Sequence, residues 1–337
     1  MEKKVNSIKD IAEISGFSIS TVSKAINNKG RVSEQNRKKI LQIVEKYHYE
    51  RNSFARALRL QQSNTIGIIT PNLNNSFFSN LVETIEKILF SNGFITVICD
   101  TSIDSKREGQ YLKKLKSQQI DGLIVISGSQ TFEDNQISDF KNVVCIDREP
   151  EDIQEYCYVG SNHYSGAKIA TQELIKKSTF PSLFMYASDS SPIKERIKGF
   201  RDTLKENSLT EDNLSIISLE QTLDVDKTRF KIRKYLRSLL KKRQGPLGIF
   251  ATSDTLAVDI LLAAKSINLN VPNDVRIVGF DDAPIARYCS PELTTIRQNI
   301  QSISEEAVEI LINGLQGEQP ENRYKKIEVE LIDRGTL

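Results

Sequence analysis

The chain has 337 residues, of which 39% are apolar and 27% are charged, and its formal net charge at pH 7 is +2. This composition is typical of a soluble globular protein long enough for more than one domain. No apolar run approaches the length of a membrane span and no signal peptide precedes the first predicted helix. We therefore expect a cytoplasmic protein without a membrane partner.

The charge is distributed unevenly along the chain. Residues 1–62 contain 13 Lys and Arg against 6 Asp and Glu, whereas acidic side chains outnumber basic ones in the remainder. A basic head on an acidic body is expected to bind a polyanion. The four cysteines lack the paired spacing of metal ligands, so we expect free thiols, no metal site and no cofactor.

Residues 7–48 are predicted to form three short helices. After the capping residue Ser7, residues 8–14 place apolar side chains at a helical period, and Gly16 then allows a tight turn because it accepts positive φ. A third helix is predicted after the capping residue Ser33. Helix, glycine turn and helix is the helix-turn-helix arrangement of DNA-binding proteins, and a generic three-helix bundle is the alternative.

The second helix follows its expected cap Ser18 and is predicted to lie in a DNA major groove. Val22 and Ile26 share the face that packs inward, while the other faces carry short, mainly polar side chains and one cation, which suits contact with base edges. Base contacts are assigned to Ile19, Ser20 and Lys24, with Ile19 able to contact a thymine methyl. The other candidate DNA contacts, chiefly to the phosphate backbone, are Ser7, Ser18, Thr21, Ser23, Asn27, Arg31 and Asn36.

From residue 66 onward, short apolar strands alternate with amphipathic helices. Strands are predicted at 66–70, 95–99, 122–127, 143–146, 183–186, 248–251 and 275–280, and helices at 79–91, 106–118, 165–176, 194–206, 226–242 and 255–267. The alternation occurs twice, before and after about residue 160, and predicts an α/β core of two doubly wound parallel-sheet lobes with a cleft between them. Ligands bind such sheets at the carboxyl ends of the strands.

Polar and aromatic side chains fall after the predicted strand ends or at the start of the next helix. Carboxylate and guanidinium groups can bracket sugar hydroxyls, and aromatic faces can cover the apolar side of a sugar ring. The candidate effector contacts are Asn75, Phe77, Phe78, Asp147, Arg148, Arg196, Ser253, Asp281 and Gln298. Structural roles are the alternatives: a core position for Phe77, and helix or turn caps for Asp254 and Asp282.

Several motifs in order resemble the lactose-repressor/galactose-repressor family of bacterial transcription regulators. They are "SIKDIAEISGFSISTVSKAINNKGRVSEQNRKKI", "NSFARALRLQQSNTIGIITPNLNNSFF", "GLIVIS", "VVCIDR", "ERIKGF", "ATSD", "VPNDVRIVGFDD" and "PELTTIRQ". The resemblance implies a headpiece at 1–48, a hinge helix and linker at 49–63 and an effector-binding and dimerisation core at 64–337. The core resembles periplasmic ribose-type binding proteins of type I, which implies lobe one at about 64–160 and 293–322 and lobe two at about 161–292 and 323–337.

The resemblance also gives roles to the hinge. Asn52 could cap a helix at 53–59, and in this family two such helices from a dimer enter the minor groove side by side. Leu58 would then be the wedge that opens a base step, with Ala55 against the groove floor. Phosphate contacts are assigned to Arg56 and Arg59. A solvated linker helix is the alternative.

The function implied is a repressor of a sugar-utilisation operon that binds palindromic operator DNA as a homodimer. A ribose-like or sucrose/fructose-type sugar between the lobes would change its operator affinity. One alternative is a regulator controlled by a phosphorylated carrier protein or a purine. Another is a sugar-converting enzyme with a DNA-binding head, but we expect no catalytic residues because only His48 and His163 are available as histidines and no nucleophile elbow is present.

Overall fold

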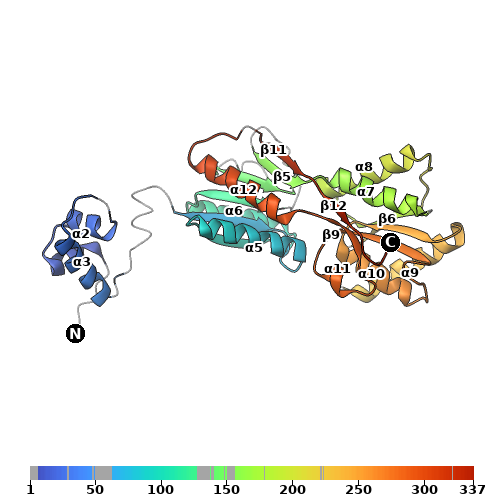
Figure 1. Ribbon diagram of the computed structural model, residues 1–337, viewed down its shortest axis with the longest axis horizontal. Helices are drawn as coiled ribbons and strands as arrows, with labels where there is room; N and C mark the ends of the chain where they lie inside the picture. The colour runs from blue at the N-terminus through green and yellow to red at the C-terminus, as the bar shows by residue number, and fades with distance from the viewer. Residues whose placement is uncertain are drawn as a thin grey trace. The chain divides into compact units, whose positions relative to one another are not determined.

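The computed structural model describes residues 7–28, 30–47, 49, 63–126, 137, 140–147, 149, 156–177, 179–220, 222, 224–320 and 322–337. The chain divides into two compact units, Met1–Ser63 and Asn64–Leu337 (Figure 1). Some candidate site residues lie outside the described residues, namely Asn52, Ala55, Arg56, Leu58, Arg59 and Arg148.

The first unit contains the helices α1 (Ile8–Ser15), α2 (Ile19–Ile26) and α3 (Glu34–Lys46). Ser7 and Asp10 form a capping box at the start of α1, and Gly16 ends that helix at a φ of 72°. The helices enclose a small core formed by Ile11, Ala12, Val22, Ala25, Ile26 and Ile40. The predicted helices, the glycine turn and the inward face of α2 are therefore confirmed.

Within the described residues, the second unit holds two six-stranded sheets, and the first has the strand order β11-β5-β4-β3-β1-β2. Its strands, all parallel, are β1 (Thr65–Thr70), β2 (Ile95–Asp100), β3 (Gly122–Ile126), β4 (Val143–Ile146), β5 (Cys157–Ser161) and β11 (Tyr324–Ile327). Apolar side chains of α5 (Ser76–Ser91) and α12 (Ile300–Leu315) form one core with this sheet, and those of α6 (Ser105–Ser117) form another. The first sheet and these helices are called lobe one.

The second sheet has the order β12-β10-β9-β8-β6-β7. Its strands are β6 (Phe180–Tyr186), β7 (Ile216–Leu219), β8 (Leu247–Ala251), β9 (Val275–Asp281), β10 (Thr294–Arg297) and β12 (Glu330–Ile332), with only β12 antiparallel among these described pairs.

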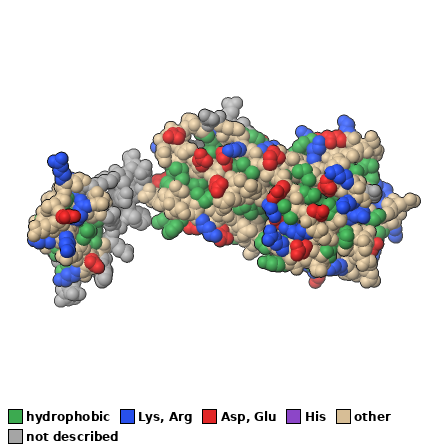
Figure 2. Space-filling view, viewed as in Figure 1, with side chains coloured by type: hydrophobic (Ala, Val, Ile, Leu, Met, Phe, Trp, Pro, Cys, Tyr) green, Lys and Arg blue, Asp and Glu red, His purple; other side chains and the backbone are tan. Residues whose placement is uncertain are grey.

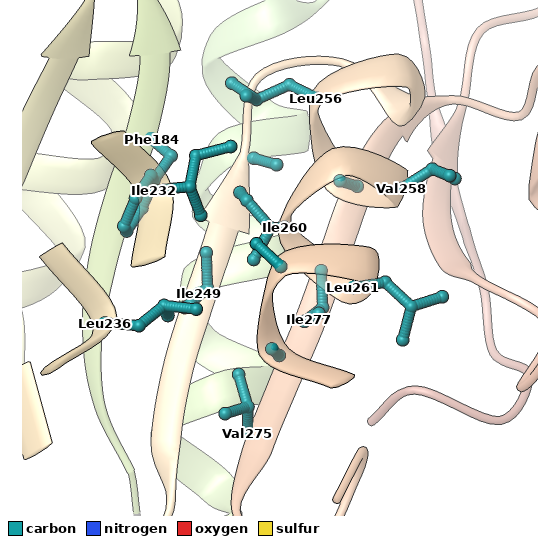
Figure 3. Packing of buried hydrophobic residues seen from close by; sticks show 14 of the residues in the cluster. Phe184, Ile232, Leu236, Ile249, Leu256, Val258, Ile260, Leu261, Val275 and Ile277 are labelled. Carbon is teal, nitrogen blue, oxygen red and sulfur yellow. The ribbon is translucent and has the colours of Figure 1, made fainter. Parts of the chain in front are cut away.

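Helices pack against both faces of the second sheet, which together with them is called lobe two. One core contains α7 (His163–Lys176) and α8 (Ser191–Glu206). The other contains α9 (Val225–Lys242), α10 (Asp254–Lys265) and the short α11 (Ile285–Tyr288). Figure 3 shows this second core, in which Ile249, Ile260 and Ile277 point toward one another from β8, α10 and β9.

The described chain crosses between the lobes after β5, after β10 and after β11. We expected 293–322 in lobe one and 323–337 in lobe two, but β10 belongs to the second sheet and β11 to the first. Strand pairing is the reason, because Thr294 lies opposite Val278 of β9 and Tyr324 lies opposite Tyr158 of β5. With the sequences TTIR and YKKI, these strands lack the continuous apolar run that marks the predicted strands.

Candidate functional site

The outer surface of α2 carries the predicted base contacts. The Ser18 hydroxyl accepts a hydrogen bond from the Thr21 amide at 3.2 Å and lies 2.9 Å from the Ser20 hydroxyl, which fixes the first turn. Ser20 and Lys24 are exposed, and the side chain of Ile19 is 46% exposed although it is large and apolar. The helix therefore presents a short polar surface with one apolar side chain and one cation, as contact with base edges requires.

The other candidate DNA contacts of the headpiece differ in their exposure and in whether their side chains already form hydrogen bonds within the headpiece. Asn27 donates from its side-chain amide to the Ser23 carbonyl at 2.8 Å and so caps α2. Ser7 is engaged in the capping box of α1, whereas Arg31 is exposed. Thr21, Ser23 and Asn36 are half-buried. The structure thus places these residues on the headpiece surface, and their contact with phosphates stays a prediction.

Between the lobes, Arg196 of α8 lies in a buried polar cluster. Its guanidinium donates to the Thr252 carbonyl at 2.5 Å and to the His163 Nδ1 atom at 3.2 Å. The guanidinium carbon lies 3.7 Å from the centre of the Phe280 ring. The Nε atom of Arg196 is buried with no hydrogen-bond partner among the described residues. A buried guanidinium with an unused donor is costly unless a water or a ligand oxygen accepts from it.

His163 links Arg196 to the predicted ligand residue Asp147. The Nε2 atom of His163 lies 2.7 Å from Oδ1 of Asp147, which directly follows β4 of lobe one. The ring is only 1% exposed, and burial lowers the pKa of His163. The imidazole is therefore neutral near pH 7.

Asp281 and Gln298 form a second hydrogen-bonded link. Gln298 donates to Asp281 at 2.7 Å and accepts from the Ser161 hydroxyl at 2.7 Å. Ser161 ends β5 and Gln298 follows β10, so the link joins two of the crossings between the lobes. Asp147, Ser161, His163, Arg196, Asp281 and Gln298 are together called the inter-lobe cluster.

The backbone is strained at two strand ends that carry carboxylates of the site. Asp147 has a φ of 62°, and the consecutive residues Asp281 and Asp282 have φ values of 121° and 54°. Such angles are uncommon for non-glycine residues, although Asp and Asn adopt them more readily than most, and Asn64 and Asn268 do so outside the site. Burial raises the pKa of Asp281 to about 7, with Arg196 acting in the opposite direction.

The remaining lobe-two candidates have structural partners. Ser253 is the N-cap of α10, and the neighbouring Asp254 accepts from the Thr295 hydroxyl at 2.5 Å and from the Ala283 amide at 2.7 Å. Burial, reinforced by Asp281, raises the pKa of Asp254 well above its ordinary value. Asp282 forms ion pairs with Arg297, at 2.7 Å, and with Arg334. It therefore holds the C-terminal segment against lobe two, which is more than the turn cap that was its alternative role.

The lobe-one candidates lie at the start of α5. Asn75 is the N-cap of α5 and accepts from the Phe77 amide at 2.9 Å. Phe77 is 5% exposed and belongs to the core of lobe one, which is the structural alternative named for it. Phe78 is half-buried and meets Phe77 edge-on with ring centres 5.4 Å apart. Only Phe78 of this pair retains exposed ring surface of any size.

Sequence reasoning missed His163 and Ser161 as site residues. Ser161 is the last residue of β5 and His163 lies two residues further on, and β5 was not among the predicted strands. The available signal was the position of His163 directly after the polar pair Ser161–Asn162, at the carboxyl end of that strand. Across the described residues, no helix is long and apolar enough to span a membrane, and no group of three or more His, Cys, Asp or Glu side chains could hold a metal ion.

Comparison with known proteins links both units to regulators. Residues 7–52 match the family described as bacterial regulatory proteins, lacI family, and residues 174–337 match the periplasmic binding protein-like domain. The chain is 31% identical over 318 residues to the sucrose operon repressor of Pediococcus pentosaceus, covering 94% of this chain and 93% of that protein. It is 28% identical to the ribose operon repressor of Halalkalibacterium halodurans, covering 98% of this chain and 97% of that protein.

A solved structure shares the core fold. The periplasmic binding protein/LacI transcriptional regulator from Alkaliphilus metalliredigens QYMF, complexed with D-xylulofuranose, superimposes with a TM-score of 0.69 at 27% identity. The superposition covers 81% of this chain and 98% of that chain.

Proposed function

This chain belongs to the lacI family of bacterial regulatory proteins, and we propose that it is a DNA-binding repressor of a sugar-utilisation operon, released from its operator by a small sugar. The headpiece reads the operator through α2, with Ile19, Ser20 and Lys24 at the bases. The sugar binds between the lobes. The relatives named for sucrose and ribose operons support this class of effector.

The observation that carries the sugar assignment is the inter-lobe cluster. Arg196 keeps an unpartnered buried Nε atom, and the carboxylates of Asp147 and Asp281 act on the same guanidinium from lobe one and lobe two. A sugar hydroxyl can accept from the guanidinium and donate to a carboxylate at once. On the lobe-one side, Thr70 at the end of β1 has a buried hydroxyl without a partner among the described residues.

DNA binding is proposed for the headpiece rather than for the core. On the face of the core shown in Figure 2, Lys and Arg side chains are mixed with Asp and Glu over both lobes. A polyanion needs a surface where cations outnumber acids, and the sequence provides one in residues 1–62.

A homodimer on a palindromic operator is the proposed assembly, because both lobes expose apolar side chains. In lobe one, the edge strand β2 exposes Ile95 at 67% and Ile98 at 42%. In lobe two, Tyr288 is 85% exposed beside a hollow of about 280 Å³ that α10 and α11 line. An open apolar edge strand favours association, and a second copy would cover both patches and present two headpieces to two half-sites.

Ligand control is proposed to act through the angle between the lobes. In this structure the Glu149 amide donates to the Ser191 hydroxyl at 3.2 Å, and Lys326 of β11 pairs with Glu195 of α8, so contacts outside the cluster also join the lobes. A sugar that favours another lobe angle would change how the hinge segments at 49–63 meet DNA. The coupling is reciprocal, so operator DNA must weaken sugar binding by the same factor.

A thermal-shift screen of the full chain tests the proposal. Pentoses, hexoses, disaccharides, their phosphates and purines are added one at a time, and a true effector raises the melting temperature further as its concentration rises. The hit must then lower the affinity for an operator recovered by selection from random duplexes. A response to purines alone would overturn the sugar assignment, and a chemically altered sugar after incubation would favour an enzyme.

A further inference from the structure

The crossings between the lobes are tied to the ligand-binding groups by side-chain hydrogen bonds. The first crossing runs from Ser161, the last residue of β5, through Asn162 to His163, the first residue of α7. Ser161 donates to Gln298 of the second crossing, and Asn162 donates to Glu328 of the third at 3.0 Å. His163 extends this arrangement to Asp147 and Arg196, so the residue at the crossing touches a ligand group of each lobe.

The two contacts of His163 determine its protonation state. A guanidinium has only donors, so the Nδ1 atom that meets Arg196 must be the acceptor and carries no proton. The Nε2 atom must then carry the proton that it donates to Asp147. Only a neutral imidazole in this tautomer makes both bonds, because protonation of Nδ1 would place a donor and a positive charge against Arg196.

We propose that His163 is a positioning residue that holds Asp147 and Arg196 in register across the first crossing, and that it does so only as the neutral Nε2–H tautomer. This inference rests on the proposed sugar-binding function. The ring fixes the carboxylate of one lobe and the guanidinium of the other before a sugar arrives, which lowers the entropy that binding must overcome. His163 lies at a crossing between the lobes. A change in the angle between the lobes would therefore also change the distance between the Asp147 carboxylate and the Arg196 guanidinium.

The charged groups around His163 act on its proton in opposite directions. Arg196 and burial disfavour the imidazolium, while Asp147 and Glu195 favour it. Asp281 and Asp254 act on Arg196 from β9 and α10 and so are one step further away. Burial and Arg196 outweigh the acidic groups, so the pKa of His163 lies below its ordinary value and the neutral ring is favoured.

Packing alone is the competing explanation, because the His163 ring also lies 5.8 Å from the Phe280 ring. The Gln variant separates the two roles. In His163→Gln, the side-chain oxygen can accept from Arg196 and the amide can donate to Asp147, without any titration between pH 5 and 8. His163→Leu fills similar space but offers neither bond.

Nitrogen-15 NMR of the full chain with labelled histidine and arginine tests the bridge without a sugar. The chain has only two histidines, so His163→Gln assigns the signals. We expect a His163 ring with the proton on Nε2 that does not titrate between pH 8 and 6, and an Arg196 side-chain signal kept in His163→Gln but lost or shifted in His163→Leu. An Nδ1–H tautomer, an ordinary titration near pH 6.5, or an Arg196 signal unchanged in His163→Leu would overturn the proposal.

The second arm uses D-ribose and sucrose as probes in calorimetric titrations. For whichever probe binds the wild-type chain, His163→Leu should weaken binding about tenfold or more, whereas His163→Gln should stay within about threefold and lose any dependence on pH. Lys168→Gln, on the same helix as His163, is the matched control, because it removes a surface ion pair of 2.7 Å to Glu206 of α8. If neither probe binds the wild type, the assignment of these sugars fails, while the NMR result still decides the role of His163.

Discussion

The headpiece and the inter-lobe cluster hold their functional side chains in opposite ways. On α2, the base-contact candidates Ile19, Ser20 and Lys24 point into solvent from a helix fixed by its cap and its buried face. In the core, Arg196 and His163 are 7% and 1% exposed and are held by each other. A DNA-binding helix contacts a large and rigid duplex, so its side chains need not be ordered by other protein groups before binding. A sugar is small, so its site must be ordered before it arrives.

This difference predicts which substitutions separate function from stability. On α2, loss of an exposed side chain should affect recognition and leave folding intact. In the cluster, loss of one member leaves its partners unpaired, so ligand response and local order should fail together.

Arg196→Ala should have the largest effect, with loss of the sugar response by about a hundredfold or more in affinity. The reason is that His163, Thr252 and the ligand all lose the same donor, and losses of charge-assisted bonds of about 1.5–3 kcal/mol each accumulate. Calorimetric titration with the sugar found by the screen measures it, and operator affinity without sugar should be unchanged. Arg201→Ala on the same helix, whose partner Glu211 is at the surface, is the control and should bind normally.

Ile11→Ala should be next, because it empties the middle of the small headpiece core. Ile11 is 0% exposed, and truncation of a buried Ile costs about 2–5 kcal/mol, which is a large part of the stability of such a small unit. We expect operator binding to be lost while the melting of the core is unchanged, as followed by calorimetry. Leu41→Ala, at a position 43% exposed on α3, should change neither. Retained operator binding in Ile11→Ala would contradict a cooperative headpiece.

The same contrast explains how far the sequence could be interpreted. The headpiece was predictable because its signals are local: Ser7 and Ser18 lie next to the helices they cap, and Gly16 lies at the turn. The doubly wound core was also predictable, since strands such as β1 and β3 are almost entirely apolar. The contacts of the cluster were not, because their partners are far apart in sequence: Ser161 and Gln298 are separated by 137 residues.

Strand composition accounts for the errors in the core. The boundary between the lobes was wrong after residue 293 because β10 (TTIR) and β11 (YKKI) are rich in polar residues, and pairing with β9 and β5 decides their sheet. His163 was missed for a similar reason, since β5 ahead of it (CYVGS) is not a continuous apolar run and was not predicted. Phe77 was named both as a ligand contact and as a core residue; packing of α5 against the sheet places it in the core, and its contact with a ligand stays a prediction.

Asp281→Asn should sharpen the comparison through pH. The pKa of Asp281 is raised to about 7, above its value in the unfolded chain, so the stabilisation from its bound proton is complete only below the ordinary aspartate pKa of about 4 and is lost as pH rises from there through 7. Relative to wild type, Asp281→Asn should therefore melt higher at pH 8, by about 2–4 °C for each kcal/mol of difference, with a smaller gain at pH 5.5 and little gain at pH 4. Melting curves across this range measure it. Equal slopes for both proteins would mean that the carboxylate is charged throughout.

Ile19→Ala should have the smallest effect and tests the exposed side of the comparison. The side chain contributes little to the headpiece core at 46% exposure, so the melting of the headpiece should change by less than about 0.5 kcal/mol. If Ile19 contacts a thymine methyl, affinity for the selected operator should fall by roughly 1 kcal/mol, with the loss confined to one base-pair position in each half-site. Binding to random duplexes and its dependence on salt should not change, because Ile19 carries no charge. Fluorescence anisotropy on single-position operator variants gives the pattern, with Leu41→Ala as the exposed apolar control. A uniform loss of affinity at all base-pair positions would show instead that Ile19 positions α2. The headpiece would then depend on side-chain packing for its function, as the inter-lobe cluster does.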